Sequence, residues 1–122
     1  MARHNETGKW GEDVSADYLA AKGYAIAERN WRSGHYEIDI VAYKDARIVF
    51  VEVKTRTRDY DDPIEAVDRQ KALRLIRAAN VYIEAKDINH EMQFDLIAVN
   101  GSSDDYRIEH IPDAFESPLR TY

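Results

Sequence analysis

Residues 36–55, YEIDIVAYKDARIVFVEVKT, are the part of the chain that best indicates its fold. Two runs rich in β-branched and aromatic residues, 36–43 and 47–55, flank a short link centred on Asp45-Ala46. Strand-forming runs separated by so few residues predict a β-hairpin. We therefore expect these two runs to be adjacent antiparallel strands.

The hairpin would bring acidic side chains together on one face. A two-residue loop sets a register in which Asp39 lies directly opposite Glu52, and Glu37 opposite Lys54. Facing residues of an antiparallel pair have Cβ atoms about 5 Å apart, and two carboxylates so close repel each other unless a proton or a cation lies between them. Mg²⁺ is commonly held by one or two protein carboxylates. We predict a magnesium site at Asp39 and Glu52, with Lys54 able to orient a water or contact a phosphate.

The alternative is that these charges lie on a solvated sheet face. An acid-x-Lys triplet occurs about once by chance in a chain of this length at average composition. However, Ile48 and Phe50 would keep the acidic face partly buried, and the opposite face is apolar, with Val49, Val51 and Val53. A half-buried cluster of charges is costly, which favours a functional interpretation.

A third acidic side chain comes from the N-terminal segment. Residues 6–22 predict a helix that Gly23 ends at the usual C-terminal cap position. Glu12 shares a helical stripe with Ser15, Ala16 and Leu19, so we expect it to face the sheet. Gly8 and Gly11 would allow a close approach. The alternative is that Glu12 is a first-turn residue favoured by the helix dipole.

The remaining segments complete a mixed sheet flanked by helices. Residues 24–31 predict a first strand, with a turn at 32–35, and residues 92–99 and 106–111 predict two further strands. A capping box at Asp62-Pro63-Ile64-Glu65 begins a helix that runs to about residue 85. This long helix predicts a crossover to a parallel strand, and hence an α/β fold. We interpret Asp95 as a structural ion-pair or hydrogen-bond partner. The four histidines show no ligand spacing.

Composition constrains the partners and the compartment. The 122 residues fit one domain, and the chain has no cysteine, no membrane-spanning run and no signal segment, so we expect a cytoplasmic protein with no membrane partner. The net charge of −6 argues mildly against nucleic acid. Residues 84–122 carry this whole excess, so a basic patch would have to lie in the first two-thirds of the chain.

These motifs together resemble the PD-(D/E)XK nuclease superfamily, whose core has the same order of helix, three strands, helix and strand. More closely, the chain resembles the YraN-like family of small bacterial proteins over nearly its whole length. The matching segments are GKWGEDVSADYLAAKGY, RNWR, EIDIVA, FVEVKTR, EAVDRQK, FDLIAV and IEHIPDAF. The arrangement is also similar to archaeal Holliday-junction resolvases. The resemblance implies a restriction-endonuclease-like αβββαβ core in a single domain, residues 1–122.

The resemblance also implies roles for individual residues. Asp39 and Glu52 would be metal ligands, the Val53 carbonyl a further ligand, Lys54 the residue beside the attacking water, and Glu12 the helix-borne acid. The chain departs from the common family pattern where Tyr36 stands in place of glycine and Gln93 in place of arginine. Tyr36 would narrow access, and Gln93 would alter how Asp95 is paired.

The implied activity is metal-dependent hydrolysis of nucleic-acid phosphodiesters, in DNA and in branched DNA, with Mg²⁺ that Mn²⁺ can replace. Residues expected to hold the nucleic-acid backbone are Arg56, Gln70, Lys71 and Arg74, although a solvated face is the alternative. Junction enzymes are commonly dimeric, so a homodimer is allowed, although no segment marks an interface. Two other functions stay open: a catalytically silent nucleic-acid-binding or assembly module, and a protein-interaction domain.

Overall fold

The computed structural model describes residues 5–56 and 69–115. Its elements follow the predicted order, and the strand bounds differ from the predicted ones by one residue at most at the start and by three at most at the end. They are α1 (Asn5–Ala21), β1 (Ala25–Ser33), β2 (Tyr36–Lys44), β3 (Arg47–Arg56), α2 (Arg69–Lys86), β4 (Glu91–Ser102) and β5 (Asp105–Ile111). The capping box predicted at residues 62–65 lies outside the described residues.

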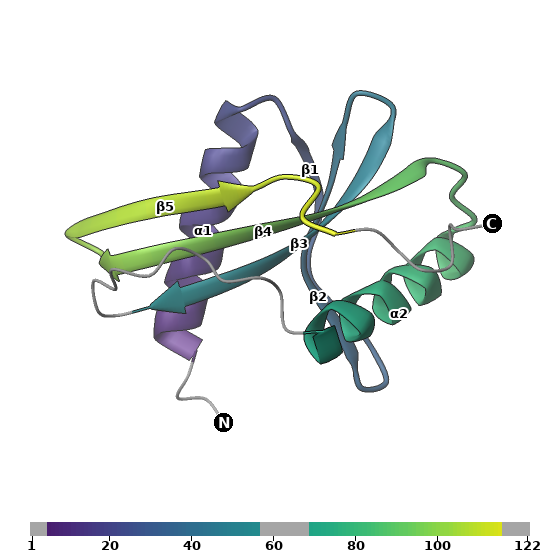
Figure 1. The fold of residues 1–122 in the computed structure, drawn as a ribbon, viewed down its shortest axis with the longest axis horizontal. Helices are drawn as coiled ribbons and strands as arrows, with labels where there is room; N and C mark the ends of the chain where they lie inside the picture. The colour runs from purple at the N-terminus through teal and green to yellow at the C-terminus, as the bar shows by residue number, and fades with distance from the viewer. Residues whose placement is uncertain (1–4, 57–68, 116–122) are drawn as a thin grey trace.

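The five strands form one mixed sheet in the order β1-β2-β3-β4-β5 (Figure 1). β3 and β4 are parallel, as the long intervening segment predicts, and the other neighbours are antiparallel. This α/β arrangement agrees with the αβββαβ core that the resemblance implies, with β5 added at one edge. No helix within the described residues is long and apolar enough to cross a membrane.

The β2–β3 hairpin has the predicted register over its paired residues. Lys44 faces Arg47 across a two-residue turn, in which Asp45 has a φ of 57°. A positive φ is what a tight hairpin turn of this kind requires, and aspartate tolerates it. The pairing continues to Ile40 and Val51 and ends there. The two strands therefore separate just before the position at which the two acids were predicted to face each other.

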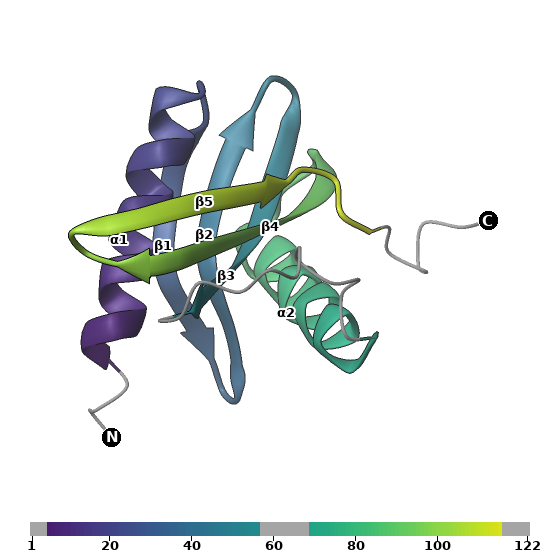
Figure 2. The ribbon, with the colours of Figure 1, turned by 60° about the vertical axis from the view of Figure 1, so that its left-hand side comes forward.

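The helices α1 and α2 cover opposite faces of the sheet (Figure 2). On β3, Ile48 and Phe50 belong to the core under α2, whereas Val49 and Val51 belong to the core under α1. This confirms the alternation predicted for β3. The predicted apolar stripe of α2 is likewise buried, at Leu75, Ile76 and Ala79.

The helix α1 lies against the sheet as predicted, with one correction. Ser15, Ala16 and Leu19 are buried, and Gly23, with a φ of 97°, ends the helix through a bond from the Tyr24 amide to the Leu19 carbonyl. A Cβ at Gly11 would overlap the Thr55 side chain on β3, so Gly11 does permit close approach. The same expectation for Gly8 was wrong, because a Cβ there would meet no atom within 4 Å.

Candidate metal and nucleic-acid site

Asp39 lies where β2 departs from β3. Its Oδ2 atom accepts a hydrogen bond of 2.8 Å from the Val53 backbone amide. The carboxylate thus replaces the backbone partner that Val53 loses when the strands separate. Because the N–H and C=O of one strand residue point toward the same neighbour, we expect the Val53 carbonyl to point toward the same side of β3 as its amide. Its role as a further ligand stays a prediction.

Glu52 lies beside Asp39, and both line a small hollow on the α2 face. This hollow, which we call the α2-side hollow, has a volume of about 150 Å³. It is lined by His35, Glu37, Asp39, Glu52, Lys71, Arg74 and Leu75. The register predicted that Asp39 and Glu52 face each other as a directly opposite pair. Instead, they line one hollow beyond the last paired residues of the two strands.

Burial and the charges of neighbouring carboxylates disfavour ionisation of both Asp39 and Glu52. Burial, followed by the charge of Glu52, raises the pKa of Asp39 to about 7, although the Val53 amide opposes the shift. Burial also raises the pKa of Glu52, and the nearby Glu37 adds to the effect, while the positive charges of Lys71, Arg74 and Lys54 oppose it. A cation between the two groups would offset both costs.

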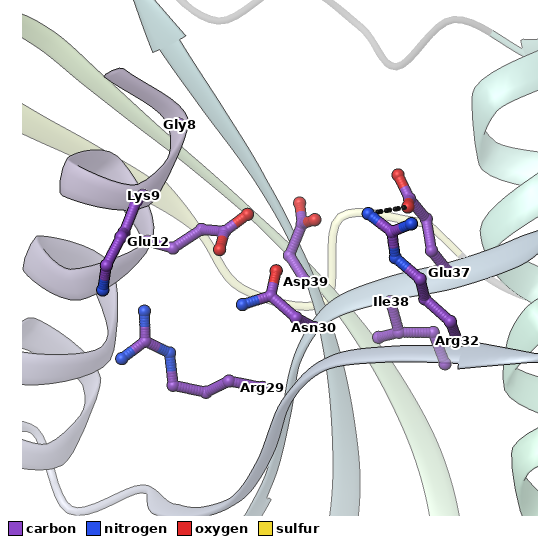
Figure 3. A pocket seen from close by; sticks show the side chains of 9 residues that line it. All are labelled: Gly8, Lys9, Glu12, Arg29, Asn30, Arg32, Glu37, Ile38 and Asp39. Atoms are coloured by element: carbon purple, nitrogen blue, oxygen red, sulfur yellow. Dashed lines mark ion pairs between the residues drawn. The ribbon is translucent and has the colours of Figure 1, made fainter. Parts of the chain in front are cut away.

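Glu12 approaches Asp39 from the opposite face of the sheet. Both residues line an open cavity of about 620 Å³, which we call the α1-side cavity. Figure 3 shows the two carboxylates extending into the same space, with Asn30 between them. Burial raises the pKa of Glu12, whereas a hydrogen bond from Asn30 and the charge of Arg29 oppose the shift. Glu12 therefore faces the sheet beside Asp39, as its helical stripe predicted, whereas its role as the helix-borne acid stays a prediction.

A local irregularity of β1 shapes this cavity. Glu28 accepts a hydrogen bond from Tyr82 of α2, and Trp31 packs on the same Tyr82 ring. Between them, Arg29 pairs with Asp13 of α1 at 2.6 Å and Asn30 bonds Glu12, also of α1. Two consecutive side chains therefore face α1, which a regular strand does not allow. Asn30 makes this possible with a φ of 53°, a left-handed conformation that asparagine tolerates.

The residues predicted to hold nucleic acid divide into two pairs. Lys71 and Arg74, in the first turns of α2, line the α2-side hollow, so the structure brings them to the carboxylates. Arg56 ends β3 and Gln70 is the second residue of α2, and neither is among the residues lining the two hollows. Lys54 is exposed on β3 and lies close enough to Glu52 for its charge to act on that carboxylate.

The donor atoms suit a hard cation that keeps some of its water shell. Within residues 5–56 and 69–115, no three His, Cys, Asp or Glu side chains converge in a way that could hold a metal. Glu12 therefore does not complete a three-carboxylate cage. Two carboxylates with one backbone carbonyl are nevertheless a normal donor set for Mg²⁺, which dehydrates reluctantly and retains several waters. The residues present fit such an ion.

Four polar residues of the α1-side cavity had not been predicted from the sequence: Lys9, Arg29, Asn30 and Arg32. The last three belong to the RNWR segment, which was interpreted only as a strand and the start of its turn. The only sequence signal for the irregularity was a pair of polar residues, Arg29-Asn30, at neighbouring positions of a strand whose side chains should alternate between the two faces. Asparagine beside arginine in such a run is compatible with a left-handed residue, but spacing alone does not reveal the break.

Asp95 is a buried structural centre away from the two hollows. It is fully buried and accepts hydrogen bonds from four groups, which confirms its predicted structural role. The donors are the Tyr24 hydroxyl at 3.0 Å, the Gln93 amide at 2.9 Å, the Asp113 backbone amide at 2.9 Å and His110 Nε2 at 2.8 Å. Gln93 also accepts from Arg47, so it links Asp95 to β3.

Comparison with known proteins adds the following. The model of "Uncharacterised protein family UPF0102" matches residues 11–99 of the chain. UPF0102 proteins of Bacteroides thetaiotaomicron and Bacteroides fragilis are each 48% identical over 120 residues, covering 98% of this chain and 99% of the relative. One from Flavobacterium psychrophilum is 45% identical over 116 residues, covering 94% and 98%. The matched residues include every carboxylate of the site described above.

Proposed function

This chain belongs to the uncharacterised protein family UPF0102, the YraN-like family that its motifs resemble, and we propose that it is a divalent-metal-dependent endonuclease acting on DNA, including branched DNA. One observation carries the proposal. Asp39 and Glu52 share a hollow beyond the last paired residues of β2 and β3, and burial raises both pKa values. Carboxylates that lie together although burial disfavours their ionised form are typical of a site for a cation and a phosphate.

The metal would be Mg²⁺, replaceable by Mn²⁺, held by Asp39, Glu52 and the Val53 carbonyl. When bound, it supplies Lewis-acid stabilisation of the charge that develops on the phosphate oxygens. The chain's own groups do the rest. The Val53 amide fixes the orientation of the Asp39 carboxylate through its 2.8 Å bond, so that little reorganisation is needed when substrate arrives.

Three cations surround Glu52 and are suited to hold the phosphodiester. Lys71 and Arg74 line the same hollow, and Arg74 can contact two phosphate oxygens at once through its planar guanidinium. The exposed Lys54 lies along the strand from Glu52 and would position the attacking water and stabilise negative charge. A DNA substrate would place the protein in the cytoplasm, and a chain without cysteine fits that reducing compartment.

The test is a cleavage assay with the full chain and either Mg²⁺ or Mn²⁺ on linear, flapped and four-way DNA. Glu52→Gln removes one ligand charge, and Glu84→Gln changes an exposed carboxylate near the far end of α2 as a matched control. We expect cleavage by the wild type and by Glu84→Gln, and none by Glu52→Gln. Equal cleavage by both variants would refute the site. Salt-sensitive binding without cleavage under either ion would identify a catalytically silent nucleic-acid-binding module instead.

A further inference from the structure

We propose, building on the nuclease function above, that the α1-side cavity binds one unpaired nucleotide of the substrate, adjacent to the phosphate held at Asp39 and Glu52. Among the residues that line this cavity, the resemblance gives roles to Glu12 and Asp39 alone. The proposal rests on the size of the two hollows, on the groups that line the larger one, and on the way β1 is built to form it.

The two hollows differ in what they can hold. The α1-side cavity, at about 620 Å³, falls within the range of about 300–1,000 Å³ typical of small-molecule sites. The α2-side hollow, at about 150 Å³, lies below that range and suits a phosphate between Lys71 and Arg74. Asp39 and Glu37 line both spaces, so the two adjoin. A polymer with a phosphate at Asp39 would therefore place its neighbouring nucleoside in the larger cavity.

The lining of the α1-side cavity matches a nucleotide better than a bare anion. Three cations, three acids and one amide line it: Lys9, Arg29, Arg32, Glu12, Glu37, Asp39 and Asn30. Figure 3 shows Lys9 and Arg29 on one side, the Arg32–Glu37 ion pair on the other, and the Asn30 amide between them. The carboxylates and the amide can form hydrogen bonds with base edges, and the guanidinium plane of Arg32 offers a surface for stacking.

The concave shape also selects for an unpaired nucleotide. A base within a duplex is stacked on both faces and bonded to its partner, so it can enter such a cavity only after leaving the helix. The cost of leaving is least for a base that is already single-stranded or mismatched. A flap or a single-stranded junction supplies such a base, whereas a fully paired linear duplex does not.

The irregularity of β1 at Asn30 supports a binding site in the α1-side cavity. A non-glycine residue with a positive φ carries a conformational cost, and such residues concentrate where function requires them. Here the left-handed Asn30 places two consecutive polar side chains, Arg29 and Asn30, toward the cavity and α1. Arg29 is held by Asp13 at 2.6 Å, so this wall is fixed before any ligand arrives.

Gly8 provides a way to close the cavity without touching the carboxylates. It lines the cavity, and a Cβ there would meet no atom within 4 Å. Gly8→Trp would fill the space, while Gly8→Ala makes the same backbone change and leaves it open. Asn30→Gly is an independent second variant, because glycine keeps the left-handed backbone and removes only the amide.

The experiment measures binding in the Glu52→Gln background, so that no probe is consumed. The probes are DNA with 2-aminopurine in a single-stranded flap and the matching fully paired duplex. We expect Gly8→Trp to raise the dissociation constant for the flap about tenfold relative to Gly8→Ala, with less than about a twofold change for the duplex. We expect Asn30→Gly to reduce the same preference for the flap.

Equal effects of Gly8→Trp on both probes, or none on either, would overturn the cavity assignment, as would Asn30→Gly binding both probes as before. Cleavage by the protein with Glu52 intact is measured separately. If the flap preference is present and depends on Gly8 but no cleavage occurs with Mg²⁺ or Mn²⁺, the nuclease proposal fails and the nucleotide site stands. If cleavage occurs on paired duplex as fast as on the flap, the nuclease stands and the unpaired-nucleotide site fails.

Discussion

At the scale of single residues, Asp39 is where the two faces of the site meet. It lines both hollows, receives the Val53 amide, and experiences the charges of Glu52 on one side and Glu12 on the other. A carboxylate in this position is expensive to ionise without a cation. Its titration should therefore appear in the stability of the metal-free protein.

The pKa of Asp39 is raised from 3.8 to about 7, mainly by burial and then by Glu52. At a pH between these two pKa values, the folded state binds one proton more than the unfolded state. The free energy of unfolding of the metal-free protein therefore falls as pH rises through this range. Asp39→Asn removes the charge. In EDTA we expect this variant to be more stable than wild type at about pH 8, with the difference shrinking toward about pH 4.

Chemical denaturation of both proteins across that pH range measures this effect. Added Mg²⁺ should then restore stability to the wild type at high pH and leave Asp39→Asn unchanged, because binding to the folded state alone stabilises it. A stability difference that is constant with pH would mean that the Asp39 carboxyl titrates as an ordinary surface group.

Lys54 is exposed, so its replacement should affect chemistry and leave folding intact. We expect Lys54→Ala to lower kcat by about 100-fold or more, as removal of a positioned charge-stabilising group commonly does. The thermal midpoint should stay within about 2 °C of wild type, because an exposed substitution rarely changes stability much. Lys22→Ala, at the far end of α1, is the matched control. Undiminished kcat in Lys54→Ala would remove this residue from the mechanism.

The sequence was sufficient to propose Asp39, Glu52 and Lys54, because period-two alternation and a two-residue turn determine which side chains of the hairpin share a face. It was not sufficient to predict the left-handed conformation of Asn30. A left-handed residue inside a strand is set by the backbone, and its consequence, two neighbouring side chains on one face, contradicts the rule from which strand faces are predicted.

At the scale of elements, the packing of α1 on β3 depends on one glycine. A Cβ at Gly11 would overlap the Thr55 side chain, whereas one at Gly8 meets nothing within 4 Å. Alanine is a better helix former than glycine by about 1 kcal/mol. We therefore expect Gly8→Ala to be neutral or stabilising by up to about 1 kcal/mol, and Gly11→Ala to be destabilising.

Urea unfolding measures the stability of the two variants. Both replace a glycine of α1 by alanine, so the difference between them reports the contact with Thr55 and not the helix propensity of alanine. A Gly11→Ala protein as stable as Gly8→Ala would show that α1 can shift away from β3 at no cost. Cleavage assays on both would then show whether the placement of Glu12 depends on this close approach.

The register of the hairpin could be predicted, but the point at which it opens could not. The paired residues from Lys44–Arg47 to Ile40–Val51 follow directly from the short turn. The separation beyond Ile40 depends on how the twisted strands meet the two helices on opposite faces. That is a property of tertiary packing, and no local pattern in residues 36–55 encodes it.

At the scale of the whole molecule, Asp95 joins segments that are distant in sequence. Its partners come from the link between α1 and β1, from β4 and β5 and from the turn after β5: Tyr24, Gln93, His110 and Asp113. Burial acts to raise the pKa of Asp95, but hydrogen bonds, led by that from His110, outweigh it and the pKa is lowered. The ionised carboxylate is therefore stabilised by the fold.

Asp95→Ala would leave several buried donors without an acceptor, so we expect a loss of about 3–5 kcal/mol in the free energy of unfolding. Because the folded pKa lies below the unfolded value, the stabilisation by Asp95 is present above about pH 4 and is lost as pH falls further. The wild type should therefore lose stability in acid more steeply than Asp95→Asn. Glu84→Ala, at an exposed position, should change stability by less than about 0.5 kcal/mol. A small effect of Asp95→Ala would contradict the structural role.

The order of elements, the mixed sheet and the buried faces could be predicted from hydrophobic period and turn residues. Asp95 could be predicted as a structural partner because an acid in the run FDLIAV needs one, but its four donors lie 2, 15, 18 and 71 residues away in the chain. Contacts at such separations arise only when the whole fold is assembled, which is why the network could not be specified in advance.

Calorimetric titration of the metal-free protein with Mn²⁺ shows whether Asp39 and Glu52 hold a divalent cation. We expect saturable binding to the wild type and to the Glu84→Gln control, with release of protons near neutral pH because the raised pKa of Asp39 must be overcome. Binding should be lost in Asp39→Asn and in Glu52→Gln. Equal Mn²⁺ binding by wild type and both site variants, or no binding by any of them, would show that these two carboxylates are not metal ligands.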